Sequence, residues 1–248
     1  MTTAGLLRHQ LAYEQRTIWR NPAAVFFSLG LPLVMLAIFT TLNSDDVLPD
    51  GQTFASYFVP GMLVFGLVNA TYGVIASRTV LRRDGGQLKR ARATPLPLRL
   101  FLAGMVLSSL VSATVAAVLV LAVGRLAFGV ALPSRPGVVV LCLVLGGTSF
   151  SALGLALSTV IPNPDAADPM IYGTVLPLLF ISGVFDQVPA GSALDRVAEV
   201  FPVRHLLEAA LASTGHSDGQ LVLHLLVVVA WGIAGSVIAT HRFRWEPR

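Results

Sequence analysis

Six apolar stretches, each long enough to cross a bilayer, dominate the pattern of hydrophobic and polar positions. They cover residues 25–42, 54–77, 100–123, 138–160, 169–185 and 221–240, and none contains Asp, Glu, Lys or Arg. A helix needs about 17 to 25 apolar residues to cross a hydrocarbon core. No alternating barrel pattern is present, and lipid tolerates no unpaired backbone groups. The pattern predicts an all-α polytopic membrane protein with six transmembrane helices.

The first span is preceded by a segment with helical periodicity, residues 5–20. Its apolar positions share one face and its charged residues, Glu14 among them, lie elsewhere. The apolar positions of that face are Leu7, Leu11 and Ile18. This pattern predicts an amphipathic helix lying on the membrane, with a break at Asn21 and Pro22.

The fifth span is followed by residues 188–219, which are too interrupted to form a span. Two apolar pieces, 193–201 and 203–212, meet at Pro202. Because proline cannot donate the helical hydrogen bond, we expect two short helices at the outer surface. The sequence contains no internal repeat or low-complexity linker, so we expect a single domain over residues 1–248.

Composition agrees with a membrane protein, because only 12% of residues are charged and 54% are hydrophobic, against about 25% charged in soluble domains. The net charge of +4 could suggest nucleic acid. The basic residues flank spans instead of forming a soluble face, so we expect membrane lipid and not nucleic acid as their partner. The single cysteine, Cys142, lies in an apolar stretch and excludes a disulfide framework or a thiolate metal site.

The distribution of Lys and Arg predicts the orientation. Thirteen of the 17 fall before the first span, between the second and third, or after the sixth, whereas the alternate loops hold four. Positive charge concentrates on the cytoplasmic side of short loops. We therefore expect both termini and the segment 78–98 in the cytoplasm.

The spans lack the ionisable residues of ion-coupled transporters, and the chain lacks a nucleotide-binding P-loop. Ion-coupled transporters commonly carry ionisable residues at membrane depth, and here the only one is His224, near the outer end of its span. A P-loop requires Gly-Lys-Ser/Thr, whereas the sole lysine, Lys89, stands between Leu88 and Arg90. We expect no ATPase site and no bound cofactor or metal in this chain.

Small residues recur at four-residue spacing within the spans, which lets helices approach closely. Such stripes predict packing within the subunit in the first place, with a substrate pathway or a subunit seam as the alternative. The positions considered are Gly104, Ser108, Ser112, Ser149 and Ser151, together with Asn69, the clearest polar side chain of the second span.

An intramembrane serine protease is the enzyme alternative. Ser149 in the fourth span and His224 in the sixth resemble the placement in rhomboid proteases. At about 1.5 Å rise per residue, the two side chains would differ in depth by roughly 10 Å, whereas a dyad needs about 3 Å. The sequence therefore disfavours this function and predicts no catalytic residue.

Residues 78–98 hold six of the 17 Lys and Arg residues. A role in fixing the orientation of the chain in the membrane would explain the charge. It would not require the spacing of Leu81 and Leu88 by seven residues, the break at Asp84 and Gly85, or the sequence TPLP that ends the segment. The segment RRDGGQLKRARATPL resembles the cytoplasmic loop of ABC-2-type exporter permeases, which reads acid, basic residue, Gly-Thr, a leucine-rich turn, Arg and Thr-Pro-Leu. Gly86 replaces the threonine of that pattern.

Three further motifs are similar to this family. YFVPGML, from Tyr57, resembles the beginning of its second span, LFISGVFDQVP, from Leu179, the outer end of its fifth span, and FPVRHLLEAA, from Phe201, its short outer helices. The amphipathic amino-terminal helix is also an element of the family. The resemblance covers nearly the whole chain.

The resemblance implies that the loop couples to a separate ATP-binding cassette subunit, which carries ATP and Mg. The matching coupling residues are Leu81, Arg82, Arg83, Asp84, Gly85, Leu88 and Arg92. We expect Leu81 and Leu88 to form an apolar ridge that enters a groove on the ATPase, while flanking arginines pair with its acidic rim. By the same resemblance, two permease chains would meet at their first and fifth spans.

The sequence thus favours a permease subunit of an ATP-driven exporter in a bacterial cytoplasmic membrane. The uncharged spans favour an amphipathic or lipid-like cargo, such as an antibiotic or a lipid. A polysaccharide or glycolipid exporter is the nearest alternative, and a membrane scaffold without transport is another.

Overall fold

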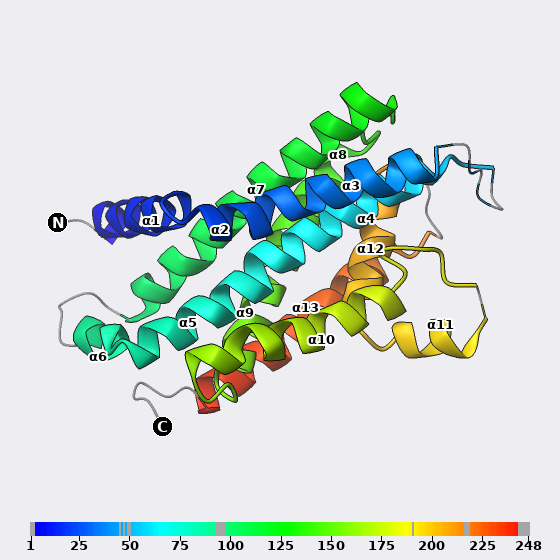
Figure 1. The fold of residues 1–248 in the computed structure, drawn as a ribbon. Coiled ribbons are helices and arrows are strands. Elements are labelled where there is room, and N and C mark those ends of the chain that lie inside the picture. The colour runs from blue at the N-terminus through cyan, green and yellow to red at the C-terminus, as the bar shows by residue number, and fades with distance from the viewer. Residues whose placement is uncertain are drawn as a thin grey trace.

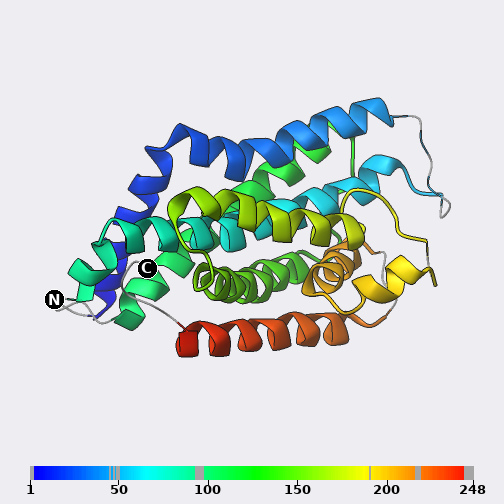
Figure 2. The same ribbon diagram turned by 60° about the horizontal axis from the view of Figure 1, so that its bottom comes forward.

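The computed structural model describes residues 3–44, 46, 48, 51–92, 98–189, 191–215 and 219–242. The regular elements within these ranges are helical. The long helices lie side by side as one bundle, and α1 extends from its end at an angle (Figures 1 and 2). The expectation of an all-α protein is confirmed.

The first helices follow the predicted pattern. Helix α1 covers Thr3–Trp19, and Pro22 begins the next helix, as expected from proline at a first helical position. The first apolar stretch comprises α2 (Pro22–Val25), η1 (Phe26–Gly30) and α3 (Leu31–Leu42); the second comprises α4 (Phe54–Val68), η2 (Asn69–Gly73) and α5 (Val74–Asp84).

The remaining helices follow in order. They are α6 (Gln87–Arg92), α7 (Leu98–Phe128), α8 (Pro136–Leu141), η3 (Cys142–Gly146), α9 (Gly147–Ser158), η4 (Pro164–Ala166), α10 (Ala167–Ile181), α11 (Ala193–Ala198), α12 (Pro202–Ala212) and α13 (Leu221–Arg242). The elements named η1, η2 and η3 are single π-helical turns within longer helices, and η4 is a 3₁₀ turn.

In the described ranges, four helices are long and apolar enough to cross a membrane. They are Phe54–Asp84, Leu100–Phe128, Pro136–Ser158 and Leu221–Arg242. Ser28–Leu42 is a shorter apolar helix, and α10 has 15 residues. The predicted number of six spans therefore stays a prediction.

The second apolar stretch forms the centre of the bundle. Its most apolar window is 89% buried, against 22% for α13. Phe54 and Phe58 stack at a ring distance of 4.9 Å, and Phe58 also stacks on Phe39 of α3. This burial explains why the helix can hold polar groups: they are surrounded by protein instead of lipid.

Small residues bring the helices together. A side chain at Gly154 of α9 would meet the Tyr72 backbone oxygen of η2 at 2.5 Å, and one at Gly232 of α13 would overlap Ser149. Ser151 donates to the Gly147 carbonyl within α9, and its hydroxyl lies 3.4 Å from the hydroxyl of Ser109 on α7. The packing interpretation of Ser149 and Ser151 is supported by these contacts.

The small-residue stripe of α7 packs against α1. Gly104 lies directly against Gln10, and Gln15 donates to both the carbonyl and the hydroxyl of Ser108, at 2.8 and 3.0 Å. Ser112 donates to the Ser108 carbonyl at 3.2 Å. Gly104 and Ser108 therefore position the amino-terminal helix, whereas the Ser112 bond lies within α7.

The two short helices predicted between residues 188 and 219 are present as α11 and α12. Pro202 begins α12, so the break lies at residues 199–201. Helix α12 is largely buried against α4 and α13. It lies toward the end of the bundle opposite α1 and α6 (Figure 2).

Candidate functional site

The arginine-rich end of the bundle is built by a helix that continues past the predicted span. Helix α5 runs to Asp84 instead of ending at residue 77, and Gly85 and Gly86 then turn the chain into α6. Gly86 has a φ of +65°, a conformation that β-branched residues rarely adopt. The glycine at the family's threonine position is therefore required by the shape of this turn.

A buried ion cluster fastens α1 to α5. Arg82 donates from Nη1 and Nη2 to Oε1 and Oε2 of Glu14, at 2.8 and 2.7 Å, and Arg78 donates from Nη1 to Oε2 at 3.2 Å. Gln10 also donates to Glu14 Oε1. Glu14 is completely buried. The prediction that Glu14 lies away from the face of Leu7, Leu11 and Ile18 is wrong: it follows Leu11 by three residues and precedes Ile18 by four, so it shares that buried face.

Arg83 makes a second connection, to the end of α9. It donates to the carbonyls of Ser158 and Ile161, at 2.9 and 2.5 Å. The last carbonyls of a helix have no partner within it, and a positive charge there interacts favourably with the helix dipole. Arg83, at the end of the second apolar stretch, therefore caps the carboxyl end of α9, which belongs to the fourth.

The predicted apolar ridge is not formed. Leu81 is 52% exposed, but Leu88 is 1% exposed, because the turn at Gly85 and Gly86 folds α6 back onto the bundle. Arg82 and Arg83 are buried in contacts within the chain, so they are not available to an acidic rim on another protein.

Fewer residues of this segment are exposed than the sequence predicted. Exposed residues of the turn are Leu81, Asp84, Gly85, Gln87 and Arg90. Arg92 is the last residue of α6, but its side chain and residues 93–97 lie outside the described part of the chain.

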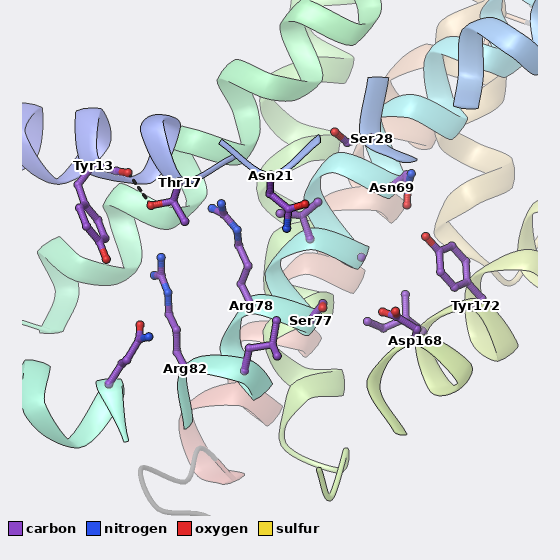
Figure 3. Close-up of a pocket in the computed structure, with 15 residues that line it drawn as sticks. Tyr13, Thr17, Asn21, Ser28, Asn69, Ser77, Arg78, Arg82, Asp168 and Tyr172 are labelled. Atoms are coloured by element: carbon purple, nitrogen blue, oxygen red, sulfur yellow. Dashed lines mark hydrogen bonds between the residues drawn. The ribbon is translucent and has the colours of Figure 1, made fainter. Parts of the chain in front are cut away.

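A cavity of about 490 Å³ opens beside the ion cluster. Figure 3 shows it between α1, α5 and the beginning of α10: Arg78 and Arg82 reach from α5 toward α1, and Asp168 and Tyr172 stand on α10 across the space. The π turns η1 and η2 contribute Ser28 and Asn69. Such turns are frequent at functional sites. Asn69, a candidate pathway residue, thus lines this cavity.

The opposite end of the bundle is closed by tight packing. The Tyr57 hydroxyl donates to the Gly183 carbonyl, and a side chain at Gly61 would overlap the Val184 carbonyl. The predicted fifth span, residues 169–185, therefore ends early: α10 stops at Ile181, and the turn after it packs on the YFVPGML motif.

The model of the ABC-2 type transporter family matches residues 6–214. The chain belongs to the ABC-2 type transporter family. A comparison with curated proteins finds no match. The match extends from α1 to α12, so it includes both the cavity and the closed end.

Membership in this family gives the chain its general role. ABC-2 membrane domains are transport subunits, and they generally work with an ABC ATP-binding partner. With its apolar helices, this ABC-2 permease is a multi-pass membrane protein.

Two histidines of the ABC-2 permease form a pair that the sequence did not indicate. Nδ1 of His205 lies 2.8 Å from Nδ1 of His224, and Nε2 of His205 lies 2.8 Å from the Glu199 carbonyl. Their separation of 19 residues includes a turn between α12 and α13, so no helical spacing reveals it. The pair joins these two helices at the closed end.

The protease geometry is not assembled. Ser149 packs against Gly232, which lies eight residues beyond His224 on α13. That is about 12 Å along the helix. Within the described residues, no group of three His, Cys, Asp or Glu side chains could hold a metal ion.

Proposed function

We propose that this ABC-2 permease exports an amphipathic or hydrophobic compound across a bacterial cytoplasmic membrane, with its arginine-rich end in the cytoplasm. A drug, an antibiotic or a lipid-like molecule is the class of cargo. Energy comes from a separate ATP-binding subunit that holds ATP and Mg. Two permease chains form the working unit.

The observation that carries this proposal is the difference between the two ends of the bundle. A cavity of about 490 Å³ opens at the arginine-rich end, and α12 and the Tyr57–Gly183 contact close the other. A transporter that loads from the cytoplasm needs this arrangement before ATP drives a change between two packed states. The volume is within the usual range of about 300–1,000 Å³ for ligand sites.

The turn between α5 and α6 is the docking point for the ATPase. Asp84 and Arg90 are exposed there, and Arg90 is fixed by a hydrogen bond of 2.9 Å to the Gly85 carbonyl. The same segment is anchored internally by Arg82 to α1 and by Arg83 to α9. A displacement of this turn would therefore be transmitted to α1, α5 and α9 together.

Charge reversal of the exposed turn tests this assignment. The full chain is expressed with its ATPase partner, and the amount of ATPase that co-purifies is measured together with ATP hydrolysis. We expect Asp84→Lys with Arg90→Glu to reduce association about 10-fold or more, because paired interface charges are reversed.

Arg125→Glu is the matched control, since Arg125 is exposed at the far end of α7. It should leave association unchanged. A charge-reversed chain that elutes as a folded protein and still binds a fully active ATPase would contradict the docking assignment. A folded wild-type chain that never binds an ATPase would contradict the exporter itself.

A further inference from the structure

The ion cluster beside the cavity carries more positive than negative charge. Glu14 supplies one carboxylate, and Arg78 and Arg82 supply two guanidinium groups. Arg82 occupies both carboxylate oxygens at short distance, whereas Arg78 has one longer contact of 3.2 Å. An uncompensated charge in a largely buried site is costly, and a counter-charge relieves that cost.

Arg78 is the member of the cluster that the cavity can reach. Its side chain keeps 16% of its surface exposed and lines the cavity. In the described part of the chain it is paired with no carboxylate other than Glu14. Asp168, the acidic residue across the cavity, is exposed and belongs to the opposite wall (Figure 3).

The rest of the lining is both polar and apolar. Ser77 and Tyr172 line the same cavity as Arg78, and Val74, Leu81 and Ile171 supply an apolar side. Leu81 is half exposed at the turn. A charged wall with hydroxyl donors next to an apolar wall suits a molecule with an anionic head and an apolar tail.

We propose that this cavity binds an amphiphile through an anionic phosphate or carboxylate head held by Arg78. The inference rests on the proposed export function and names its substrate class. The guanidinium of Arg78 donates to the head, and the tail lies along Val74 and Ile171. Arg82 remains with Glu14 and keeps α1 in place.

Binding to three related probes tests the proposal. The full chain in a neutral detergent is titrated with short-chain phosphatidylglycerol, with the diacylglycerol of the same chains, and with glycerol 3-phosphate. Calorimetry gives each dissociation constant. We expect phosphatidylglycerol to bind at least about 10-fold more tightly than either part alone, since only it engages both walls.

Variants assign the binding to the cavity. Arg78→Gln should weaken phosphatidylglycerol binding about 10- to 100-fold by removing a charge-assisted contact, and Arg78→Lys should retain most of it. Ser77→Phe places a large side chain in the cavity and should also abolish binding. Arg8→Gln, an exposed arginine of α1, is the control and should change nothing.

Each contrary result is decisive. Equal affinity for glycerol 3-phosphate would show a site for soluble anions, and equal affinity for diacylglycerol would show that charge is not recognised. Unchanged phosphatidylglycerol binding by folded Arg78→Gln and Ser77→Phe would place the ligand elsewhere. The titration needs neither ATP nor a partner, so its failure is separate from a failure of ATPase association.

Discussion

The helices at the two ends of this permease are held together by different interactions. At the arginine-rich end, α1, α5 and α9 are joined by buried charges: Glu14 with Arg82, and Arg83 with the carbonyls of Ser158 and Ile161. At the other end, α4 and the turn after α10 meet through close backbone approach, as at Gly61 and Val184, and the ion pairs of Arg204 with Asp195 and Glu208 are part-exposed.

This difference suits two tasks, which are to transmit a movement at the arginine-rich end and to seal the bundle at the other end. Charged contacts are directional and have defined partners, so an element held by them moves as a unit when it is pushed. Close packing without space between helices seals a path and resists small displacements. The cavity lies at the charged end, between α1, α5 and α10.

The largest effect is expected from removing the charge that joins α1 to α5. Glu14→Gln leaves Arg78 and Arg82 buried without a counter-ion, and loss of one partner of a buried pair costs about 3–5 kcal/mol. The free energy of unfolding in mixed micelles measures it. Glu208→Gln is the comparison at the closed end, where the Arg204–Glu208 pair is part-exposed and i,i+4 in a helix, and should cost less than about 1 kcal/mol.

A double variant tests whether the loss of stability in Glu14→Gln comes from the unpaired arginine charge or from the changed shape of the side chain. Glu14→Gln together with Arg82→Met removes one charge of each sign and should recover part of the lost stability. Equal stability of Glu14→Gln and Glu208→Gln would mean that the two ends do not differ as described.

An intermediate effect is expected from disturbing the packed end. Gly61→Ala places a methyl group against the Val184 carbonyl oxygen, which is backbone and cannot turn aside. Overpacking of this kind costs about 1–3 kcal/mol. Gly137→Ala in α8 is the control, because nothing lies within 4 Å of the added atom; it should be neutral or stabilising by up to about 1 kcal/mol. The same unfolding measurement compares them, and equal values would contradict a tight approach at Gly61.

The smallest effect is expected from a single hydroxyl at the closed end. Tyr57→Phe removes the donor to the Gly183 carbonyl in a buried site and should cost about 0.5–1.5 kcal/mol. Tyr72→Phe loses a hydrogen bond to Thr174 that is exposed and should cost less. The reverse order in unfolding experiments would show that the hydroxyl does not hold the turn.

The helices could be predicted where hydrophobicity alone decides their position, but not where single contacts do. The predicted second span stopped at residue 77 because charges follow, yet α5 continues to Asp84, since Arg82 and Arg83 find partners inside the protein. The predicted fifth span continued to residue 185 because Val184 and Phe185 are apolar. The chain turns earlier, at Gly183, with a φ of +81°.

The candidate site was predictable as a segment and not as a set of contacts. The family motif located the turn between α5 and α6, but the spacing of Leu81 and Leu88 suggested a shared face that the glycine turn abolishes. Glu14 was placed off the apolar face of the first helix, although its spacing from Leu11 and Ile18 puts it on that face; the spacing predicts its burial but not its partners. Its partners lie 64 and 68 residues away, and no local pattern carries that information.

Accessibility to a thiol reagent tests the central claim, that the cavity is open on the cytoplasmic side and closed on the other. In a Cys142→Ser background, a membrane-impermeant maleimide is applied to sealed vesicles of each orientation carrying Ser77→Cys, in the cavity, or Ser182→Cys, buried after α10. We expect Ser77→Cys to react only in inside-out vesicles and Ser182→Cys to react in neither. Reaction of Ser77→Cys from the outer side, or ready reaction of Ser182→Cys, would contradict it.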